Sequence, residues 1–163
     1  MSKLPTVLII GCGSIGERHL RTFQSTGRCH VIACDTRPAI LADMAEKYKV
    51  ETSTDWKTAM ASPACTTVVI CTPAPYHVPM ATEVLKSGRH CLIEKPLALS
   101  LEGMDELTAA HQASGRACHV AYVNHSRNEP RAAKAFLDRG VFGPVRAAST
   151  TGGQNFPTFR PAY

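Results

Sequence analysis

TVLIIGCGSIGERHL, residues 6–20, runs from a short apolar segment directly into three glycines spaced G-x-G-x-x-G. An uninterrupted apolar run of this length, TVLII over 6–10, is typical of a β-strand buried on both faces. The residues after the glycines repeat apolar positions at helical spacing and predict a helix over 14–26, which Gly27 ends. The stretch therefore predicts a strand, a tight turn and a helix in direct succession.

The rest of the chain continues this alternation. Further predicted strands cover 30–34, 66–72, 90–94 and 117–123, with a short extended piece at 50–54. Further predicted helices cover 37–49, 55–62, 76–88 and 101–114, the last with Ser100 as its N-cap. Strands that alternate with helices form a parallel sheet covered by helices on both faces. The sequence thus predicts an α/β protein, a Rossmann doubly wound parallel sheet.

The glycine spacing fits a loop that holds the pyrophosphate of a dinucleotide. Gly11 would permit the tight turn, Gly13 would let the backbone approach the phosphates, and Gly16 would let helix and strand pack closely. The N–H groups at the start of the helix, including those of Ser14 and Ile15, would then face the phosphates. A glycine-rich turn without a ligand is the alternative.

Asp35 ends the next predicted strand, 19 residues after Gly16. An acidic residue in this place would accept hydrogen bonds from the hydroxyls of the adenosine ribose. Its charge favours NAD, because it would repel the 2′-phosphate of NADP. Arg37 follows two residues later and could bind that phosphate, so NADP is also possible. The alternative is that Asp35 is an ordinary helix cap.

Two further motifs follow predicted strands. CTPAPYH covers 71–77, and EKP covers 94–96. Both would lie at the carboxyl edge of the sheet, where ligands bind in open α/β folds. A lysine at this edge, Lys95, could hydrogen-bond a substrate hydroxyl, and partial burial would lower its pKa toward the range useful for proton transfer. An ordinary solvated charge is the alternative for this residue.

Together these stretches resemble the Gfo/Idh/MocA oxidoreductases, the family of glucose–fructose oxidoreductase and inositol dehydrogenase. The resemblance rests on GCGSIGERHL, on the TP…H turn, on EKP and on VFGPVRAAS over 141–149. It implies a Rossmann domain that binds NAD(P) and a lysine, Lys95, in the catalytic position beside the nicotinamide. It also implies that cofactor contacts come from Thr72, Pro73, His77, Glu94, Lys95 and Pro96. For His77 the alternative is a residue at a helix start that bonds the backbone.

The resemblance also implies a substrate class and a second domain. Members mostly oxidise or reduce sugars, cyclitols and their derivatives by hydride transfer at a carbinol carbon. We expect a Rossmann domain over 1–121, then over 122–163 a linker and the beginning of a truncated second α/β domain, with a helix over 130–140 and a strand over 144–153. Within that incomplete substrate and oligomerisation domain, residues 124–163 should be disordered or should pair with another copy of the chain. A non-catalytic dinucleotide-binding module, regulatory or a remnant of a shortened gene, is the alternative function.

Composition excludes several other classes of protein. Apolar residues make up 44% of the 163 residues, and the net charge of +5 comes from scattered lysines and arginines. No run is typical of a nucleic-acid-binding stripe or of a membrane span, so we expect a cytoplasmic protein without nucleic-acid or membrane partners. The seven cysteines form no C-x-x-C pair. We therefore expect reduced thiols and no metal site.

Overall fold

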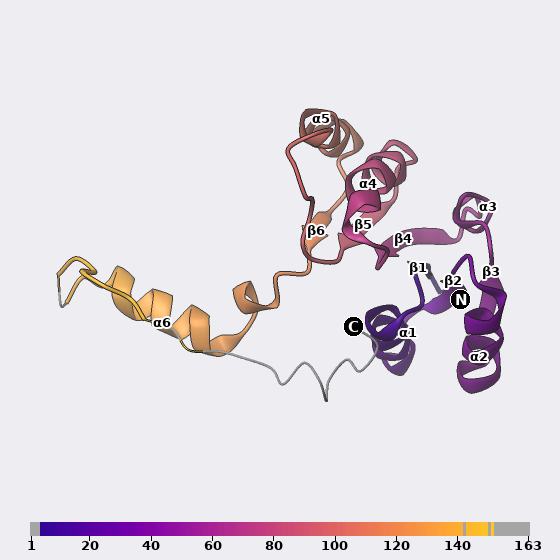
Figure 1. Cartoon of the computed structure of the whole chain (residues 1–163), viewed down its shortest axis with the longest axis horizontal. Helices are drawn as coiled ribbons and strands as arrows, with labels where there is room; N and C mark the ends of the chain where they lie inside the picture. The colour runs from indigo at the N-terminus through magenta and orange to yellow at the C-terminus, as the bar shows by residue number, and fades with distance from the viewer. Residues whose placement is uncertain (1–3, 142, 150, 152–163) are drawn as a thin grey trace. The chain divides into compact units, whose positions relative to one another are not determined.

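The computed structural model describes residues 4–141, 143–149 and 151. Its contacts divide the chain into two compact units, residues 1–122 and residues 123–163. The first unit contains all the glycine, Asp35, TP…H and EKP motifs (Figure 1).

The first unit is built on a six-stranded sheet in which every pair of neighbours is parallel. Its spatial order is β3-β2-β1-β4-β5-β6. The order reverses direction between β1 and β4, which is the topological switch point of a doubly wound sheet. The strands are β1 (Thr6–Ile10), β2 (His30–Cys34), β3 (Glu51–Ser53), β4 (Cys65–Ile70), β5 (His90–Ile93) and β6 (Cys118–Val120). The predicted Rossmann fold is confirmed.

Helices cover both faces of this sheet (Figure 1). One face is covered by α1 (Ser14–Ser25) and α2 (Pro38–Tyr48). The other is covered by α3 (Trp56–Met60), α4 (His77–Lys86) and α5 (Met104–Ser114), with the short 3₁₀ helix η1 (Ala74–Tyr76) before α4. This two-sided cover explains why TVLII carries no polar alternation: all five residues of β1 are buried.

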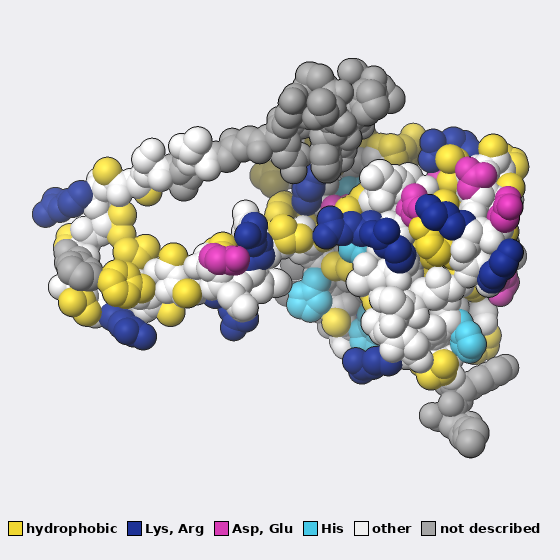
Figure 2. Space-filling view, turned by 90° about the horizontal axis from the view of Figure 1, so that it is seen from below, with side chains coloured by type: hydrophobic (Ala, Val, Ile, Leu, Met, Phe, Trp, Pro, Cys, Tyr) yellow, Lys and Arg dark blue, Asp and Glu magenta, His cyan; other side chains and the backbone are white. Residues whose placement is uncertain are grey.

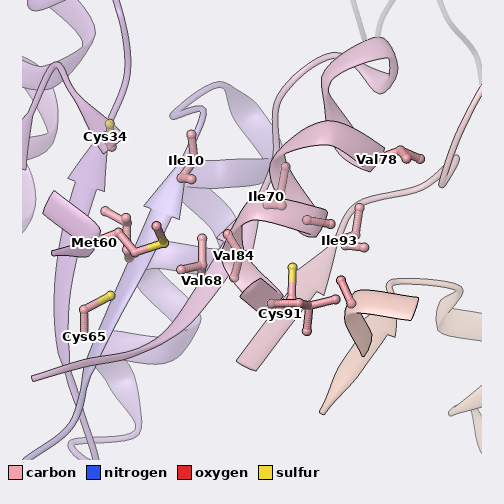
Figure 3. Packing of buried hydrophobic residues seen from close by; sticks show 14 of the residues in the cluster. Ile10, Cys34, Met60, Cys65, Val68, Ile70, Val78, Val84, Cys91 and Ile93 are labelled. Atoms are coloured by element: carbon pink, nitrogen blue, oxygen red, sulfur yellow. The ribbon is translucent and has the colours of Figure 1, made fainter. Parts of the chain in front are cut away.

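Alternate residues of the central strands pack into two separate cores. Leu8 and Ile10 join the core under α3, α4 and α5, whereas Val7 and Ile9 join the one under α1 and α2. Figure 3 shows the first of these cores, with Ile70 and other strand side chains gathered against α4. Fully burying each such aliphatic side chain stabilises the fold by roughly 1.5–3 kcal/mol. The central strands are therefore a rigid base for the loops that follow them.

One helix begins later than the sequence predicted. The prediction that Ser100 caps this helix is wrong, because α5 starts at Met104 with Gly103 in the N-cap position at φ +75°. The Ser100 hydroxyl instead accepts the N–H of Glu102 at 3.3 Å and closes a local turn. Serine side chains satisfy nearby backbone groups in turns as readily as at helix starts.

The second unit contains the 3₁₀ helix η2 (Val123–His125) and α6 (Asn128–Asp138). Pro130 lies in the first turn of α6, where a missing N–H costs nothing. The predicted strand over 144–153 does not form in 144–149 or 151, the part of that stretch that the structure describes. A strand needs a paired neighbour, and the described residues of this unit provide none. Self-association through 122–163 stays a prediction.

The surface carries mixed charge. Within the described ranges no helix has the length and apolar character needed to cross a bilayer. Lysine and arginine side chains lie at separate places on the face that Figure 2 shows, with acidic side chains among them. All seven cysteines are free thiols.

Candidate functional site

The candidate site lies at the carboxyl ends of β1 and β4, at the switch point of the sheet. The loop after β1 contains Gly11 and Gly13, α1 begins at Ser14, and Gly16 lies in the first turn of α1. The Gly11 N–H donates to the Cys34 carbonyl at 2.8 Å, which ties the loop to the end of the neighbouring β2.

Two of the three glycines are fixed by close packing. Gly11 has φ +87°, and a methyl group on it would lie 2.8 Å from the backbone carbonyl group of Cys71. A methyl group on Gly16 would lie 1.8 Å from the Gly11 carbonyl oxygen. No L-residue with a side chain fits either position without displacing backbone. The loop is therefore held tightly against β4 and against the first turn of α1.

Gly13 differs, because it is exposed and a methyl group there would meet nothing within 4 Å. The first hydrogen bond of α1 runs from the Glu17 N–H to the Gly13 carbonyl at 2.9 Å. The N–H groups of Ser14, Ile15 and Gly16 precede Glu17, the first helical donor, and are the orphan donors of this helix start. Open space beside orphan donors at the positive end of a helix fits an anion such as a pyrophosphate.

Asp35 follows β2 and points its carboxylate back at the glycine loop. Its Oδ2 accepts the Cys12 N–H at 2.8 Å, and its Oδ1 accepts the Arg37 N–H at 3.0 Å. The Arg37 guanidinium adds two more bonds, Nε to Oδ1 at 2.9 Å and Nη2 to Oδ2 at 3.0 Å. This guanidinium, helped by both N–H groups, lowers the pKa of Asp35 from its ordinary value of 3.8 to about 2. Asp35 is thus a buried, ionised carboxylate at physiological pH.

Replacing Asp35 by Asn is expected to destabilise the fold in a manner that depends on pH. Because the pKa of this carboxyl is depressed by folding, its ionised form stabilises the protein fully above the ordinary value of 3.8, and that contribution is lost as pH falls through about 2. Urea unfolding of both proteins should show a stability difference near neutral pH that shrinks between about pH 4 and about pH 2. If the difference in unfolding free energy between the two proteins is as large at about pH 2 as it is near neutral pH, this account is contradicted.

The thiols of Cys12 and Cys34, which lie near Asp35, do not add negative charge beside its carboxylate. Cys12 is 3% exposed, and its thiol donates to the Cys34 carbonyl at 3.5 Å. Burial, reinforced by the charge of Asp35, raises the pKa of the Cys12 thiol to about 12. Burial likewise raises the pKa of Cys34 to about 11. The sequence pattern did not reveal that the Cys12 N–H holds Asp35, although Cys12 stands inside the glycine motif.

The TP…H turn packs directly on the glycine loop. Thr72 is half-buried and its backbone nitrogen is 3.0 Å from where a methyl group on Gly11 would lie, while Pro73 is exposed. His77 begins α4 and is only 1% exposed. Its Nε2 lies 2.7 Å from the Thr72 carbonyl oxygen and its Nδ1 lies 2.8 Å from the Pro96 carbonyl oxygen. His77 therefore joins the turns after β4 and β5 through backbone carbonyls, and its predicted contact with a cofactor stays a prediction.

The EKP turn is joined to the middle of α1 by a contact between side chains. Glu94 is 8% exposed, and its Oε1 lies 2.8 Å from Nε2 of His19 on α1. Its Oε2 accepts the Lys95 N–H at 3.1 Å. The Lys95–Pro96 peptide bond is cis. The partnership of His19 with Glu94 could not be predicted from the sequence, because the two residues are 75 apart along the chain and meet only once it is folded.

Lys95 and Pro96 are both exposed at the surface of this unit. The partial burial anticipated for Lys95 is not supplied by the described residues around it. The glycine loop, the TP…H turn and the EKP turn nevertheless meet at one edge, held together by Asp35, His77 and Glu94. The arrangement can hold an anion at the start of α1 and present a lysine on the adjoining turn.

Comparison with known proteins identifies relatives of this chain. Residues 6–122 match the model of the Gfo/Idh/MocA family, described as an oxidoreductase family with an NAD-binding Rossmann fold. Over 119 residues the chain is 29% identical to 4-carboxy-2-hydroxymuconate-6-semialdehyde dehydrogenase from Sphingobium sp. strain SYK-6, covering 72% of this chain and 38% of that protein.

Two solved structures are similar in fold and sequence. One is GenD2 from gentamicin A biosynthesis in complex with NAD, with 29% identity and a TM-score of 0.68 over 74% of this chain and 35% of that one. The other is myo-inositol 2-dehydrogenase from Lactobacillus plantarum, with 25% identity and a TM-score of 0.79 over 88% of this chain and 43% of that one. The chain thus spans less than half the length of each of these three proteins.

Proposed function

Because the chain belongs to the Gfo/Idh/MocA oxidoreductase family, whose matched part is an NAD-binding Rossmann fold, we propose that it acts on a sugar, a cyclitol or a derivative of one by hydride transfer at a carbinol carbon. The family is described as NAD-binding, and the similar GenD2 structure is a complex with NAD. The second similar structure is a dehydrogenase of myo-inositol, which is a cyclitol. The reaction and the substrate class are our proposal for this chain.

The observation that carries the proposal is the glycine loop beside Asp35. Open space lies over Gly13, next to the orphan N–H groups of Ser14, Ile15 and Gly16. These groups would hold the pyrophosphate, because a helix start favours negative charge. Asp35 would hold the adenosine ribose on the neighbouring strand end. The residues present therefore fit a dinucleotide.

The EKP turn would hold the reacting end of the cofactor and the substrate. Bound NAD would supply a hydride acceptor, and NADH a hydride donor. In this proposal Lys95 hydrogen-bonds the substrate hydroxyl and takes up its proton during oxidation. Glu94, anchored to His19, holds the Lys95 backbone N–H and so orients the turn that carries the lysine.

Titration of the full chain with NADH, followed by an assay for NAD reduction over a panel of sugars and cyclitols, tests this function. Lys95→Ala is expected to lower turnover by about a hundredfold or more, the usual effect of removing a general acid or base. It should weaken NADH binding far less, because the glycine loop and Asp35 would hold the other end of the cofactor. Lys86→Ala, which changes an exposed lysine at the end of α4, is the matched control and should leave both quantities unchanged. Turnover that survives Lys95→Ala would remove Lys95 from the mechanism.

A non-catalytic dinucleotide-binding module is the second candidate, and the exposure of Lys95 favours it. An exposed lysine stays hydrated, whereas a catalytic base gains from a site that excludes water. Tight NADH binding by the wild-type chain without turnover on any polyol or sugar would support the module. Absence of NADH binding would refute both candidates.

A further inference from the structure

Two cysteines lie opposite each other on the last two strands of the sheet. Cys91 on β5 and Cys118 on β6 are register partners of a parallel pair, so their side chains point to the same face. Both pack in the core under α3, α4 and α5, where Figure 3 labels Cys91. Among the strand pairings of the described residues, this is the one that places two cysteines opposite each other.

The spacing of the two strands suits a disulfide bond. Neighbouring strands lie about 4.7–4.9 Å apart, and the Cα atoms that a disulfide joins are about 4.4–6.8 Å apart. The Cys91 N–H donates to the Ala117 carbonyl at 2.9 Å, which fixes this spacing beside the pair. The two thiols are already linked by a hydrogen bond. Because β6 is a short edge strand, side-chain rotation and a slight shift of β6 are enough to bring the sulfur atoms together.

The two thiols differ in reactivity. Cys91 is 3% exposed, whereas Cys118 is partly exposed on the edge strand. The hydrogen bond from Cys91 lowers the pKa of the Cys118 thiol, and the same bond, together with burial, raises the pKa of the Cys91 thiol. The thiolate is the nucleophilic form of cysteine. A small oxidant therefore reacts first with Cys118, and Cys91 is placed to react second.

We propose that Cys91 and Cys118 form a site of reversible oxidation, at which hydrogen peroxide converts the two thiols into a disulfide that joins β5 to β6. The Cys118 thiolate attacks one peroxide oxygen, the O–O bond breaks, and a sulfenic acid forms with release of hydroxide. The Cys91 sulfur then attacks the sulfenic sulfur, the S–S bond forms, and the S–O bond breaks with release of water. With the proton that Cys118 lost, one peroxide is reduced to two waters. Neither cysteine belongs to the proposed dinucleotide site.

The disulfide closes the segment from β5 through α5 to β6 into a covalent loop. β5 leads into the EKP turn, and β6 is the last strand of the first unit. A cross-link restricts the unfolded chain, and it also keeps the short edge strand from separating from β5. The oxidised protein should therefore unfold at a higher urea concentration than the reduced protein, and amide hydrogen exchange in β6 should be slower.

The test treats the folded, full-length wild-type chain with hydrogen peroxide and then blocks the remaining thiols with N-ethylmaleimide in denaturant. The number of blocked thiols should fall by two from seven, and dithiothreitol should restore all seven. Trypsin cleaves after Arg89 and Arg116, so the two cysteines fall in different peptides. Mass spectrometry without reductant should find these two peptides joined. Urea unfolding of the oxidised and reduced proteins measures the shift in midpoint.

Three variants test the order of the two steps. Cys91→Ser lacks the second thiol, so Cys118 should stay a sulfenic acid that dimedone captures. Cys118→Ser should leave Cys91 unreacted, because that thiol is buried. Cys29→Ser changes a partly buried cysteine outside the pair and should form the disulfide as the wild type does.

The wild-type chain decides the inference even where a variant fails to fold. Retention of all seven thiols, a cross-link between other cysteines of the chain, or a cross-link between two chains would each overturn the proposed site. A disulfide between Cys91 and Cys118 that leaves the urea midpoint unchanged would show that the bond does not restrain the segment it closes.

Discussion

Gly16→Ala should deprive the chain of its dinucleotide site and of much of its stability. The new methyl group would lie 1.8 Å from the Gly11 carbonyl oxygen and 2.9 Å from its carbonyl carbon. The backbone of Gly11 cannot move away from this methyl group, because Gly11 lies against the Cys71 backbone in a conformation with φ +87°. Overpacking of this kind costs about 3 kcal/mol or more when backbone must move. Urea unfolding and NADH titration of the variant measure the two losses.

Gly13→Ala is the matched control within the same loop. Gly13 has an extended backbone, with φ −69° and ψ −171°, and a methyl group there meets nothing within 4 Å. The unfolding free energy of the Gly13→Ala protein should stay within about 0.5 kcal/mol of that of the wild type, as for ordinary surface substitutions. NADH affinity should still fall, because the methyl group would occupy space that the pyrophosphate needs. A Gly16→Ala protein as stable as the Gly13→Ala protein would contradict the packing argument.

The features that one local motif encodes could be predicted from the sequence. The glycine spacing predicted the turn between β1 and α1, because Gly11 and Gly16 stand where no side chain fits. The uninterrupted apolar strands predicted a sheet buried on both faces, which the two cores confirm. Asp35 was predicted at the end of β2, and the structure turns its carboxylate toward the loop.

Features that depend on contacts between distant segments could not be predicted. His19 and Glu94 are 75 residues apart in the sequence and their side chains meet only in the folded chain, and neither residue belongs to a motif that implies the other. A contact between neighbouring residues was also not predicted: Arg37 was named as a residue that could bind the 2′-phosphate of NADP, and the structure pairs its guanidinium with Asp35. A rotamer of this kind follows from local charge and space, which a residue pattern does not contain.

The solvent exposure of Lys95 is another feature that could not be predicted from the sequence. A lysine after a buried strand predicts a functional position, but its burial depends on whatever packs over the EKP turn. The described residues of the first unit leave it open to solvent. Sequence reasoning could thus place the lysine at the correct edge of the sheet without establishing its surroundings.

His77→Ala should loosen the turn that carries Lys95 and destabilise the first unit. Both ring nitrogens of His77 lie within 2.8 Å of carbonyl oxygens, those of Thr72 and Pro96. Carbonyl oxygens only accept, so a ring N–H donates in at least one of the two contacts, with the tautomer deciding which, and alanine offers no donor to either carbonyl. Leaving a buried carbonyl without its donor costs about 1–3 kcal/mol. We therefore expect a loss of about 1–3 kcal/mol in the free energy of unfolding, measured with urea.

His77→Gln and His111→Ala make this prediction specific. Glutamine carries one amide nitrogen that can donate, so His77→Gln should recover part of the stability through one of the two turns. His111 is exposed on α5, and its replacement should change the unfolding free energy by less than about 0.5 kcal/mol. Hydrogen exchange should rise in the EKP turn of His77→Ala and not in that of His111→Ala, because only His77 bonds the Pro96 carbonyl. Equal stability of the two alanine variants would show that His77 fills space without joining the two turns.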